Sequence, residues 1–156
     1  MAKSNTCCFT GHRILAKDFS TNCLKRGIEY LIGKGVDTFV AGGALGFDTQ
    51  AALAVIELKK KHPQIKLHIY APCKNQDRLW RLEDKLKYKS ILDKADFVDM
   101  PDYDYWDGCM QARNRKMVDA SSYCIAYLDG RNSGTKSTVT YAKSTGLEVF
   151  NIYGKE

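Results

Sequence analysis

The sequence lacks the long apolar run that a membrane-spanning helix requires, because no segment approaches about 18 consecutive apolar residues. Its first residues, Met-Ala-Lys-Ser-Asn, lead straight into a strand-like segment, without the apolar stretch and cleavage site of a secretory signal. Internal repeats and low-complexity tracts are also absent, and proline is scarce. These absences argue against secreted, membrane and repeat proteins, and they predict a cytoplasmic protein with no membrane partner.

Metal-ligand patterns are absent too, although the chain has six cysteines. No Cys-x-x-Cys pair occurs, and no His lies at zinc-finger distance from a Cys. Cys7, Cys8 and Cys124 fall in apolar runs, where free cysteine behaves as a small hydrophobic residue. We therefore expect the reduced thiols of a cytosolic protein, with no bound metal and no cofactor.

The chain has the length and composition of one folded unit. Its 156 residues are 44% hydrophobic and 27% charged, which favours a single globular domain over residues 1–156. Short apolar runs alternate with segments of helical period, which predicts strands at 6–10, 38–41, 66–70, 97–100, 123–128 and 148–152 and helices at 19–33, 47–60, 77–92, 109–120 and 136–145. This alternation predicts an α/β fold, a Rossmann-like open and mostly parallel sheet with helices on both faces.

Glycine-bearing loops follow three of the predicted strands. They are Thr10-Gly11-His12-Arg13, Gly42-Gly43-Ala44-Leu45-Gly46-Phe47-Asp48 and Asp129-Gly130-Arg131-Asn132-Ser133-Gly134-Thr135. In open α/β sheets, ligands bind at the carboxyl ends of the strands. The second and third loops open into helices, whose first N–H groups attract anions. Together the loops indicate a phosphate-bearing ligand, and the alternative is that the glycines serve only the turns.

Other motifs of nucleotide and acyl chemistry are absent. The sequence has no G-x-G-x-x-G, no P-loop and no G-x-S-x-G, so dinucleotide hydride transfer, Mg²⁺-dependent nucleotide hydrolysis and a serine nucleophile lack support. Of the three histidines, only His12 lies in a predicted ligand loop. It is either a hydrogen-bonding group for the ligand or a turn residue.

Arg113 is predicted to lie on an apolar helix stripe with Met110 and Met117, at positions i, i+3 and i+7. A buried guanidinium needs an anionic or hydrogen-bonding partner. The partner is a ligand, or else Asp129 or Asp48 in a structural ion pair, unless the long side chain extends its charged end into solvent. We favour the ligand, because this helix leads into the strand that ends at the Gly134 loop.

The net charge of +6 is concentrated in one window. Between residues 57 and 94, eleven Lys and Arg stand against five Asp and Glu, which accounts for the whole excess. Arg78, Arg81, Lys85 and Lys89 are spaced to form one helix stripe, which is either a solvated face or a weak nucleic-acid contact. The following segment, 96–107, carries five aspartates and no basic residue, and it would repel nucleic acid.

The loops, in this order, resemble those of the SLOG superfamily, which includes the core of DNA-processing protein A and the LOG phosphoribohydrolases. The small single-domain YpsA-like branch is the most similar. The resemblance covers residues 8–153, and it is carried by the first two loops, Trp80, Arg113-Asn114 and Asp129-Gly130 with Ser133-Gly134-Thr135. It implies a nucleotide-type ligand held by Thr10, Gly11, His12, Arg13, Gly42, Gly43, Ala44, Gly46, Phe47, Asp48, Trp80, Arg113, Asn114, Asp129, Gly130, Ser133, Gly134 and Thr135.

The resemblance also implies where catalysis would be missing. LOG enzymes cleave the N-glycosidic bond of nucleoside monophosphates with an Arg that matches Arg113 and a Glu whose position here is Thr138. Without that carboxylate, a group that assists hydrolysis is absent. Asp48 and Arg113 remain candidate catalytic residues, with capping or loop support as the other role of Asp48.

Three functions follow in order of preference. The first is binding of a nucleotide or of an ADP-ribose-type or cyclic-nucleotide-type signal, as in superfamily members of bacterial conflict systems, by a sensor or sequestering protein. The second is LOG-like N-glycoside hydrolysis, and the third is single-stranded DNA binding like that of the DNA-processing protein A core. Superfamily relatives often pair through helices, so a homo-oligomer is left open.

Overall fold

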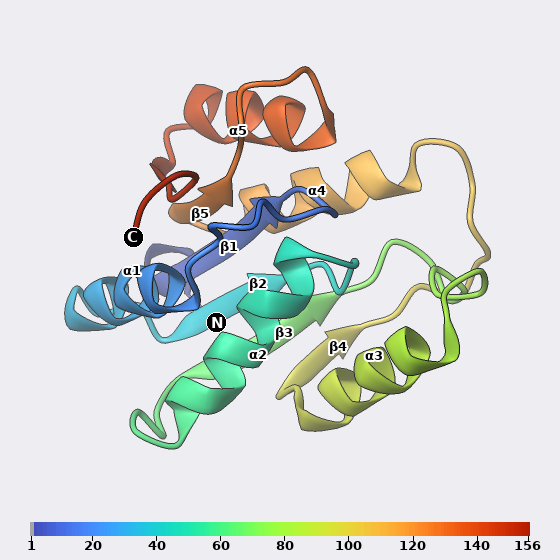
Figure 1. Cartoon of the computed structure of the whole chain (residues 1–156), viewed down its shortest axis with the longest axis horizontal. Coiled ribbons are helices and arrows are strands. Elements are labelled where there is room, and N and C mark those ends of the chain that lie inside the picture. The colour runs from blue at the N-terminus through green and yellow to red at the C-terminus, as the bar shows by residue number, and fades with distance from the viewer. Residues whose placement is uncertain (1) are drawn as a thin grey trace.

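The computed structural model, which describes residues 2–156, is built on a six-stranded sheet between two layers of helices (Figure 1). All neighbouring strands pair in parallel, in the order β4-β3-β2-β1-β5-β6. The strands are β1 (Thr6–Gly11), β2 (Thr38–Ala41), β3 (Lys66–Tyr70), β4 (Phe97–Asp99), β5 (Tyr123–Tyr127) and β6 (Glu148–Asn151). The predicted Rossmann-like α/β fold is confirmed.

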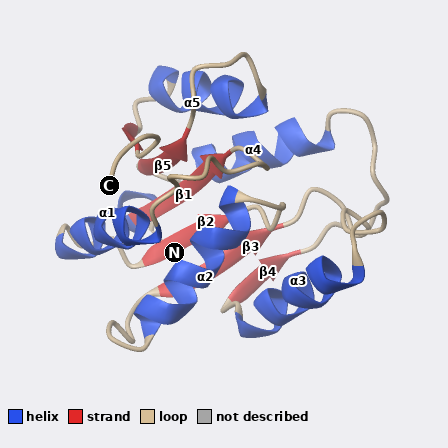
Figure 2. Cartoon of the chain, in the orientation of Figure 1, coloured by secondary structure: helices blue, strands red, loops and turns tan. Residues whose placement is uncertain are grey.

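Five α-helices connect the strands, after a short 3-10 turn at Lys3–Asn5. They are α1 (Thr21–Gly33), α2 (Phe47–Lys59), α3 (Leu82–Lys94), α4 (Cys109–Asp119) and α5 (Gly134–Ser144). Helices α1, α2 and α3 cover one face of the sheet, and α4 and α5 pack together on the other (Figure 2). Right-handed crossovers require this, because the chain moves one way along the sheet from β1 to β4 and the opposite way from β4 through β5 to β6.

Each face of the sheet has its own apolar core. The α1–α3 side is filled by large side chains such as Phe9, Phe39 and Phe47. The α4–α5 side is filled by smaller ones such as Cys8, Val40 and Cys124. Strands β2, β1 and β5 are apolar on both faces, so the middle of the sheet is buried, as continuous apolar runs predict.

Strand order reverses between β1 and β5, since the chain leaves β1 on one side and returns to β5 on the other. At such a switch point the loops after the two strands turn away in opposite directions and leave a crevice. The loop after β1 and the loop between β5 and α5 flank this crevice. The fold thus brings two of the three predicted ligand loops to one place.

The basic stripe predicted from sequence is wrong in its first half. Helix α3 begins at Leu82, so Arg78 and Arg81 precede it, and only Lys85 and Lys89 are helical. Residues before the helix form turns instead, in which the N–H of Trp80 bonds to the Asp77 carbonyl at 3.0 Å. The helix starts where two acidic residues can occupy its first turn, which is the end that favours negative charge.

Two smaller differences concern other helix starts. The structure begins α1 at Thr21 after a Ser20 cap, two residues later than predicted, and begins α5 at Gly134, two residues earlier. In both cases a serine at the N-cap accepts the N–H three residues on, which fixes the first turn.

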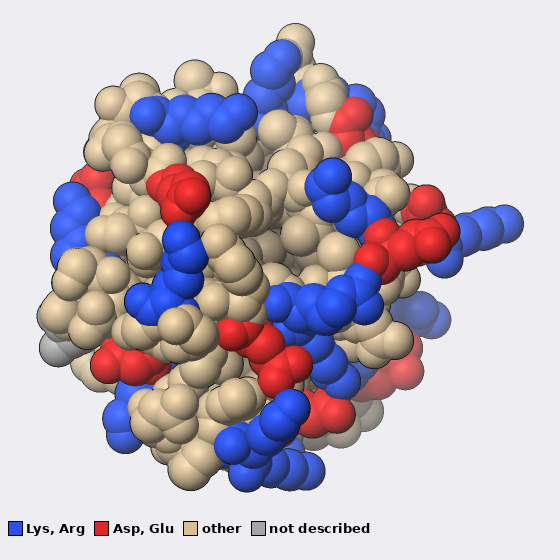
Figure 3. Space-filling model, turned by 90° about the vertical axis from the view of Figure 1, so that its left-hand side faces the viewer, with Lys and Arg blue, Asp and Glu red and all other residues tan. Residues whose placement is uncertain are grey.

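Charged side chains of both signs are interspersed on the face seen in Figure 3, which views the molecule from the side where α1 and the C-terminus lie in Figure 1. Within residues 2–156, no helix is both long enough and apolar enough to cross a membrane.

Candidate functional site

A cleft of about 280 Å³ lies at the switch point. Its walls come from the end of β1 and its loop, the start of α2, helix α4 and the start of α5. The residues that line it are Phe9, Thr10, Gly11, His12, Arg13, Ala44, Asp48, Met110, Arg113, Asn114, Ser133, Gly134 and Thr135. Residues more than a hundred positions apart in the sequence thus share one small cavity.

The loop after β1 is fixed against the start of α2. The Phe47 N–H donates to the His12 carbonyl at 3.1 Å. A Cβ at Gly11 would lie 2.4 Å from the buried Phe47 ring, and one at Gly46, where φ is +82°, would lie 2.1 Å from the Arg13 carbonyl oxygen. Both glycines therefore serve the close approach of the loop to α2.

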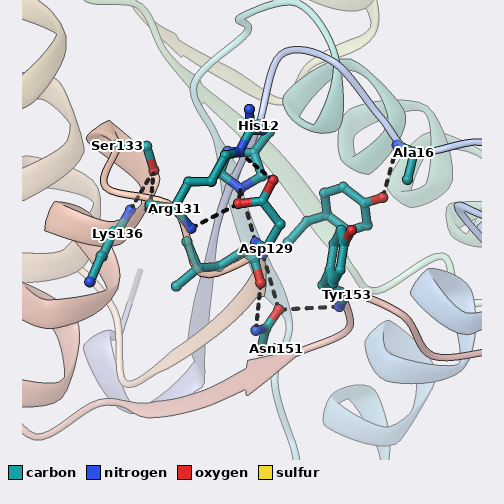
Figure 4. Close-up of polar contacts among 10 residues, drawn as sticks. His12, Ala16, Asp129, Arg131, Ser133, Lys136, Asn151 and Tyr153 are labelled. Carbon is teal, nitrogen blue, oxygen red and sulfur yellow. Dashed lines mark hydrogen bonds and ion pairs between the residues drawn. The ribbon is translucent and has the colours of Figure 1, made fainter.

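His12 joins the β1 loop to the β5 loop (Figure 4). The Asp129 N–H donates to His12 Nε2 at 3.0 Å. The Asp129 Oδ1 atom lies 3.1 Å from the same nitrogen, a contact that becomes an ion pair only when the ring is protonated. The Arg131 N–H, at 3.0 Å, helps to hold the pKa of Asp129 below its usual range. His12 thus acts first as a structural link between two ligand loops.

The start of α5 presents N–H groups to the cleft. Ser133 caps the helix, because its Oγ accepts the Lys136 N–H at 3.1 Å and its carbonyl accepts the Ser137 N–H. Within residues 2–156, the N–H groups of Gly134 and Thr135 have no hydrogen-bond partner, as expected for the first turn of a helix. Both residues line the cleft, so two donors and a helix dipole are available there for an anion.

Arg113 projects from α4 and is only 7% exposed. Its Nη1 donates to the carbonyls of Gly42, at 2.5 Å, and Tyr70, at 3.0 Å, so it ties the ends of β2 and β3 to α4. Its Nε donates to the side chain of Asn114 at 2.9 Å. In the described chain it makes no ion pair with Asp48 or Asp129. Nη2 has only the Met110 sulfur, at 3.8 Å, and is the group left for a ligand.

Asp48 is the one carboxyl among the cleft-lining residues, and its side chain is buried. Burial raises the pKa of Asp48 to about 6, against the opposing effects of the Arg113 charge and the Ala44 N–H, 3.4 Å away. Asp48 and Arg113 both lie against Gly42, since a Cβ there would be 2.6 Å from the guanidinium and 2.8 Å from the carboxylate. The absence of a side chain at Gly42 lets both charged groups reach the cleft wall.

A second and larger cavity, of about 610 Å³, adjoins the cleft. The two cavities share Arg13 and Met110 as lining residues. The larger one is also lined by Leu45, Asn75, Gln76, Arg78, Leu79, Trp80, Arg81, Asp84 and Tyr105. Trp80 therefore lies beside the cleft rather than in it.

Most of the predicted site residues meet in the cleft, and some do not. Gly42, Gly43, Gly46 and Phe47 do not line it. Of these, Gly42, Gly43 and Phe47 are buried, and Phe47 stacks on Tyr127 with ring centroids 5.7 Å apart. Asp129, which contacts His12, and Gly130 do not line the cavity. The sequence did not point to Met110, Leu79, Tyr105 or the amides of Asn75 and Gln76 as site residues. The available signal was Leu79, an apolar side chain that is 85% exposed next to the predicted Trp80.

The family model YpsA, described as the YspA SLOG family, matches residues 12–151, which include most of the three loops. The chain belongs to this family. It is 40% identical over 133 residues to the uncharacterized SPbeta prophage-derived protein YoqJ of Bacillus subtilis, covering 77% of this chain and 78% of that one. It is 36% identical over 109 residues to a UPF0398 protein of Halalkalibacterium halodurans, covering 69% of this chain and 58% of the relative.

The fold of this SLOG-family chain is similar to that of DNA processing protein A. The Streptococcus pneumoniae protein superposes with a TM-score of 0.71 over 96% of this chain and 50% of its own. The Helicobacter pylori protein, whose structure describes a single-stranded DNA binding mode, superposes with a TM-score of 0.69 over 96% and 65%. Both are 20% identical in sequence, so the similarity shows a shared fold. The chain spans half to two thirds of these two proteins.

Thr138, at the position of the LOG glutamate, is turned toward its own helix. Its Oγ1 donates to the Gly134 carbonyl at 2.9 Å, and the residue does not line the cleft. Within residues 2–156, α5 therefore contributes no carboxylate to the cleft.

Proposed function

We propose that this SLOG-family protein binds the phosphate group of a nucleotide-derived molecule in the cleft, as a sensor or sequestering protein. The observation that carries the proposal is the pair of unpartnered N–H groups of Gly134 and Thr135 at the start of α5, inside a cavity at the switch point. The Arg113 Nη2 and the exposed Arg13 add positive charge at the same cavity. Backbone donors, a helix dipole and an arginine are the groups that recognise phosphate.

Binding is proposed without efficient turnover. The α5 position that carries a glutamate in LOG enzymes holds Thr138, whose hydroxyl cannot act as a base or stabilise developing positive charge. Asp48 is the remaining carboxyl at the cleft, and its raised pKa leaves it partly protonated around pH 6. Release of free base from nucleoside monophosphates at multiple turnovers per minute, lost in Asp48→Asn, would show an enzyme instead.

The Gly134→Pro variant tests the proposal, because proline at the first helical position removes one N–H and leaves the helix intact. Ser133 already has the extended backbone that a following proline requires, and a Cβ at Gly134 meets nothing within 4 Å. Gly134→Ala is the matched control, since it also adds a Cβ at this position but keeps the N–H. Calorimetric titration with nucleoside monophosphates should show affinity reduced about tenfold or more in Gly134→Pro and little changed in Gly134→Ala.

Two results would count against the cleft as the phosphate site. One is equal affinity in Gly134→Pro and the unaltered protein, with melting temperatures that show both to be folded. The other is no heat of binding for any phosphate, ribose 5-phosphate or nucleotide tested against the unaltered protein.

A second candidate function is single-stranded DNA binding. The observation that favours it is the open cavity next to the cleft, where Trp80 and Tyr105 stand among Arg13, Arg78 and Arg81. Aromatic platforms with cationic side chains suit unpaired bases and their backbone. Affinity for a short oligonucleotide should then fall with salt by a log–log slope of about −0.7 per phosphate contact. Binding without salt dependence would rule this function out.

A further inference from the structure

We infer that the 610 Å³ cavity beside the cleft seats a nucleobase, so that the ligand is a nucleoside phosphate and not a sugar phosphate. This inference rests on the proposed function, because it assumes that the phosphate lies in the cleft. It adds the part of the ligand that is recognised and the side chains that recognise it.

The sizes of the two cavities support a ligand that occupies both. The cleft alone holds about 280 Å³, which is below the range of about 300–1,000 Å³ typical of small-molecule sites. Arg13 and Met110 line both cavities, so the two spaces are adjacent. A phosphate at the start of α5 would place the rest of a nucleotide toward the larger cavity.

Trp80 and Tyr105 supply aromatic side chains to this cavity. Contacts with neighbouring residues position the Trp80 ring and the Tyr105 backbone. The Trp80 ring packs edge-on against buried Tyr88, with centroids 5.3 Å apart. The Tyr105 N–H donates to the Asn75 Oδ1 atom at 2.8 Å, which anchors the loop that carries the ring. Rigid aromatic rings bind planar bases by stacking at little entropic cost.

Gln76 supplies a polar edge to the same cavity. Its Nε2 donates to the Tyr88 hydroxyl at 2.8 Å and lies 3.4 Å from the Gly42 carbonyl. Its Oε1 is buried and has no partner among residues 2–156. Buried acceptors are normally satisfied, and an N–H on the edge of a base is a donor of the right kind. Tyr88 thus positions both the ring of Trp80 and the amide of Gln76.

The charges around the cavity favour a ligand that carries phosphate. Arg13, Arg78 and Arg81 line it together with one acidic residue, Asp84. A purely apolar ligand would have no use for three guanidinium groups and two amides, and desolvating them would weaken its binding. A base joined to a phosphorylated ribose matches apolar, amide and cationic surfaces at once.

Fluorescence of Trp80 provides the test. The chain has two tryptophans, and Trp106 lies outside the cavity, so Trp106→Phe makes Trp80 the reporter. Titration of Trp106→Phe with inorganic phosphate, ribose 5-phosphate and the four nucleoside monophosphates should quench Trp80 only with nucleotides. In calorimetry at least one nucleotide should bind about tenfold or more tightly than ribose 5-phosphate.

Removing the aromatic rings should erase that difference. In Trp80→Ala the nucleotide should bind about as weakly as ribose 5-phosphate, whose own affinity should not change. Tyr105→Ala is a second variant. Because the Tyr105 side chain is half exposed, we expect its removal to leave the fold intact. The variant should bind nucleotides more weakly and ribose 5-phosphate as tightly as before. Trp106→Ala is the control, and it should leave all affinities unchanged.

Each outcome separates this inference from the function on which it rests. If ribose 5-phosphate binds as tightly as every nucleotide, the base site is wrong and the phosphate cleft stands. If no compound binds, both are wrong. A short oligodeoxythymidylate in the same titration identifies the source of the base. If it quenches Trp80 at lower concentration than thymidine monophosphate does, the base belongs to a nucleic acid. If it quenches Trp80 less than thymidine monophosphate does, the base belongs to a free nucleotide.

Discussion

At the scale of single residues, Asp48 links the electrostatics of the cleft to stability. Its pKa in the folded protein is about 6, raised by burial, whereas an unfolded aspartate titrates near 4. Because its pKa is higher in the folded state, the protein is more stable at low pH, where this carboxyl is protonated in both the folded and the unfolded state, than at high pH, where it is ionised in both. That extra stability is lost as the pH rises from about 4 to about 6, because the unfolded chain releases the proton first.

We therefore expect the Asp48→Asn variant to gain stability relative to the unaltered protein over this pH range. The gain should be on the order of 2–3 kcal/mol between pH 4 and pH 7, and it should be constant above pH 7. Urea denaturation of both proteins at several pH values measures it, and all other titrating groups cancel in the difference. Parallel pH profiles for the two proteins would show that Asp48 titrates normally.

Arg113 has a structural role that its sequence position did not reveal. The apolar stripe with Met110 and Met117 predicted burial, and Arg113 is buried. The sequence offered a ligand or an aspartate as its partner, and the fold supplies the carbonyls of Gly42 and Tyr70. Backbone carbonyls carry no side-chain identity, so no residue type in the sequence could point to them.

Arg113→Ala should lower the free energy of unfolding by about 1–3 kcal/mol, because the Tyr70 carbonyl loses its Arg113 donor and the Gly42 carbonyl keeps only the Gln76 amide, 3.4 Å away. Arg115→Ala, on the exposed side of the same helix, is the control and should have little effect. Denaturant unfolding of both variants checks the difference. An unchanged stability for Arg113→Ala would mean that the two carbonyl contacts contribute nothing and that a ligand is the sole reason for the arginine.

At the scale of the elements, the site depends on how closely the β1 loop approaches α2. Gly11→Ala would place a methyl group within 2.6 Å of three Phe47 atoms, and that ring is locked between Phe19 and Tyr127. We expect it to destabilise the protein by about 1–3 kcal/mol, as overpacking does. Gly134→Ala, which meets open space, should be nearly neutral. Thermal unfolding compares the two, and equal melting temperatures would show that the loop moves aside without cost.

Helix α3 shows where element boundaries could not be predicted. The charges and leucines of residues 77–92 have helical spacing, which predicted a start near Asp77. In the structure, residues 75–81 form turns, and the Trp80 ring packs against Tyr88. The helix begins only at Leu82. The tertiary contact of Trp80 decides this boundary, and local periodicity contains no information about it.

At the scale of the whole molecule, the alternation of apolar runs and helical segments was enough to predict a Rossmann-like sheet. The loops that contain Gly11, Gly43 and Gly134 were enough to indicate the edge of the sheet at which the cleft lies, because the carboxyl ends of parallel strands share one edge. The larger cavity could not be predicted. Gln76, Trp80 and Tyr105 lie in two separate connections, and only the packing of α3 and α4 around the sheet brings those connections together.

The central claim is that the start of α5 and the β1 loop together hold a phosphate group. A ¹H–¹⁵N correlation spectrum of the labelled protein, titrated with a nucleoside monophosphate, tests it directly because it reports on each backbone N–H. We expect saturable shifts, largest at the amides of Gly134 and Thr135 and next at Gly11–Arg13. Shifts confined to the outer groove of α5 around Lys136 and Tyr141, or no saturable shift at all, would contradict the account.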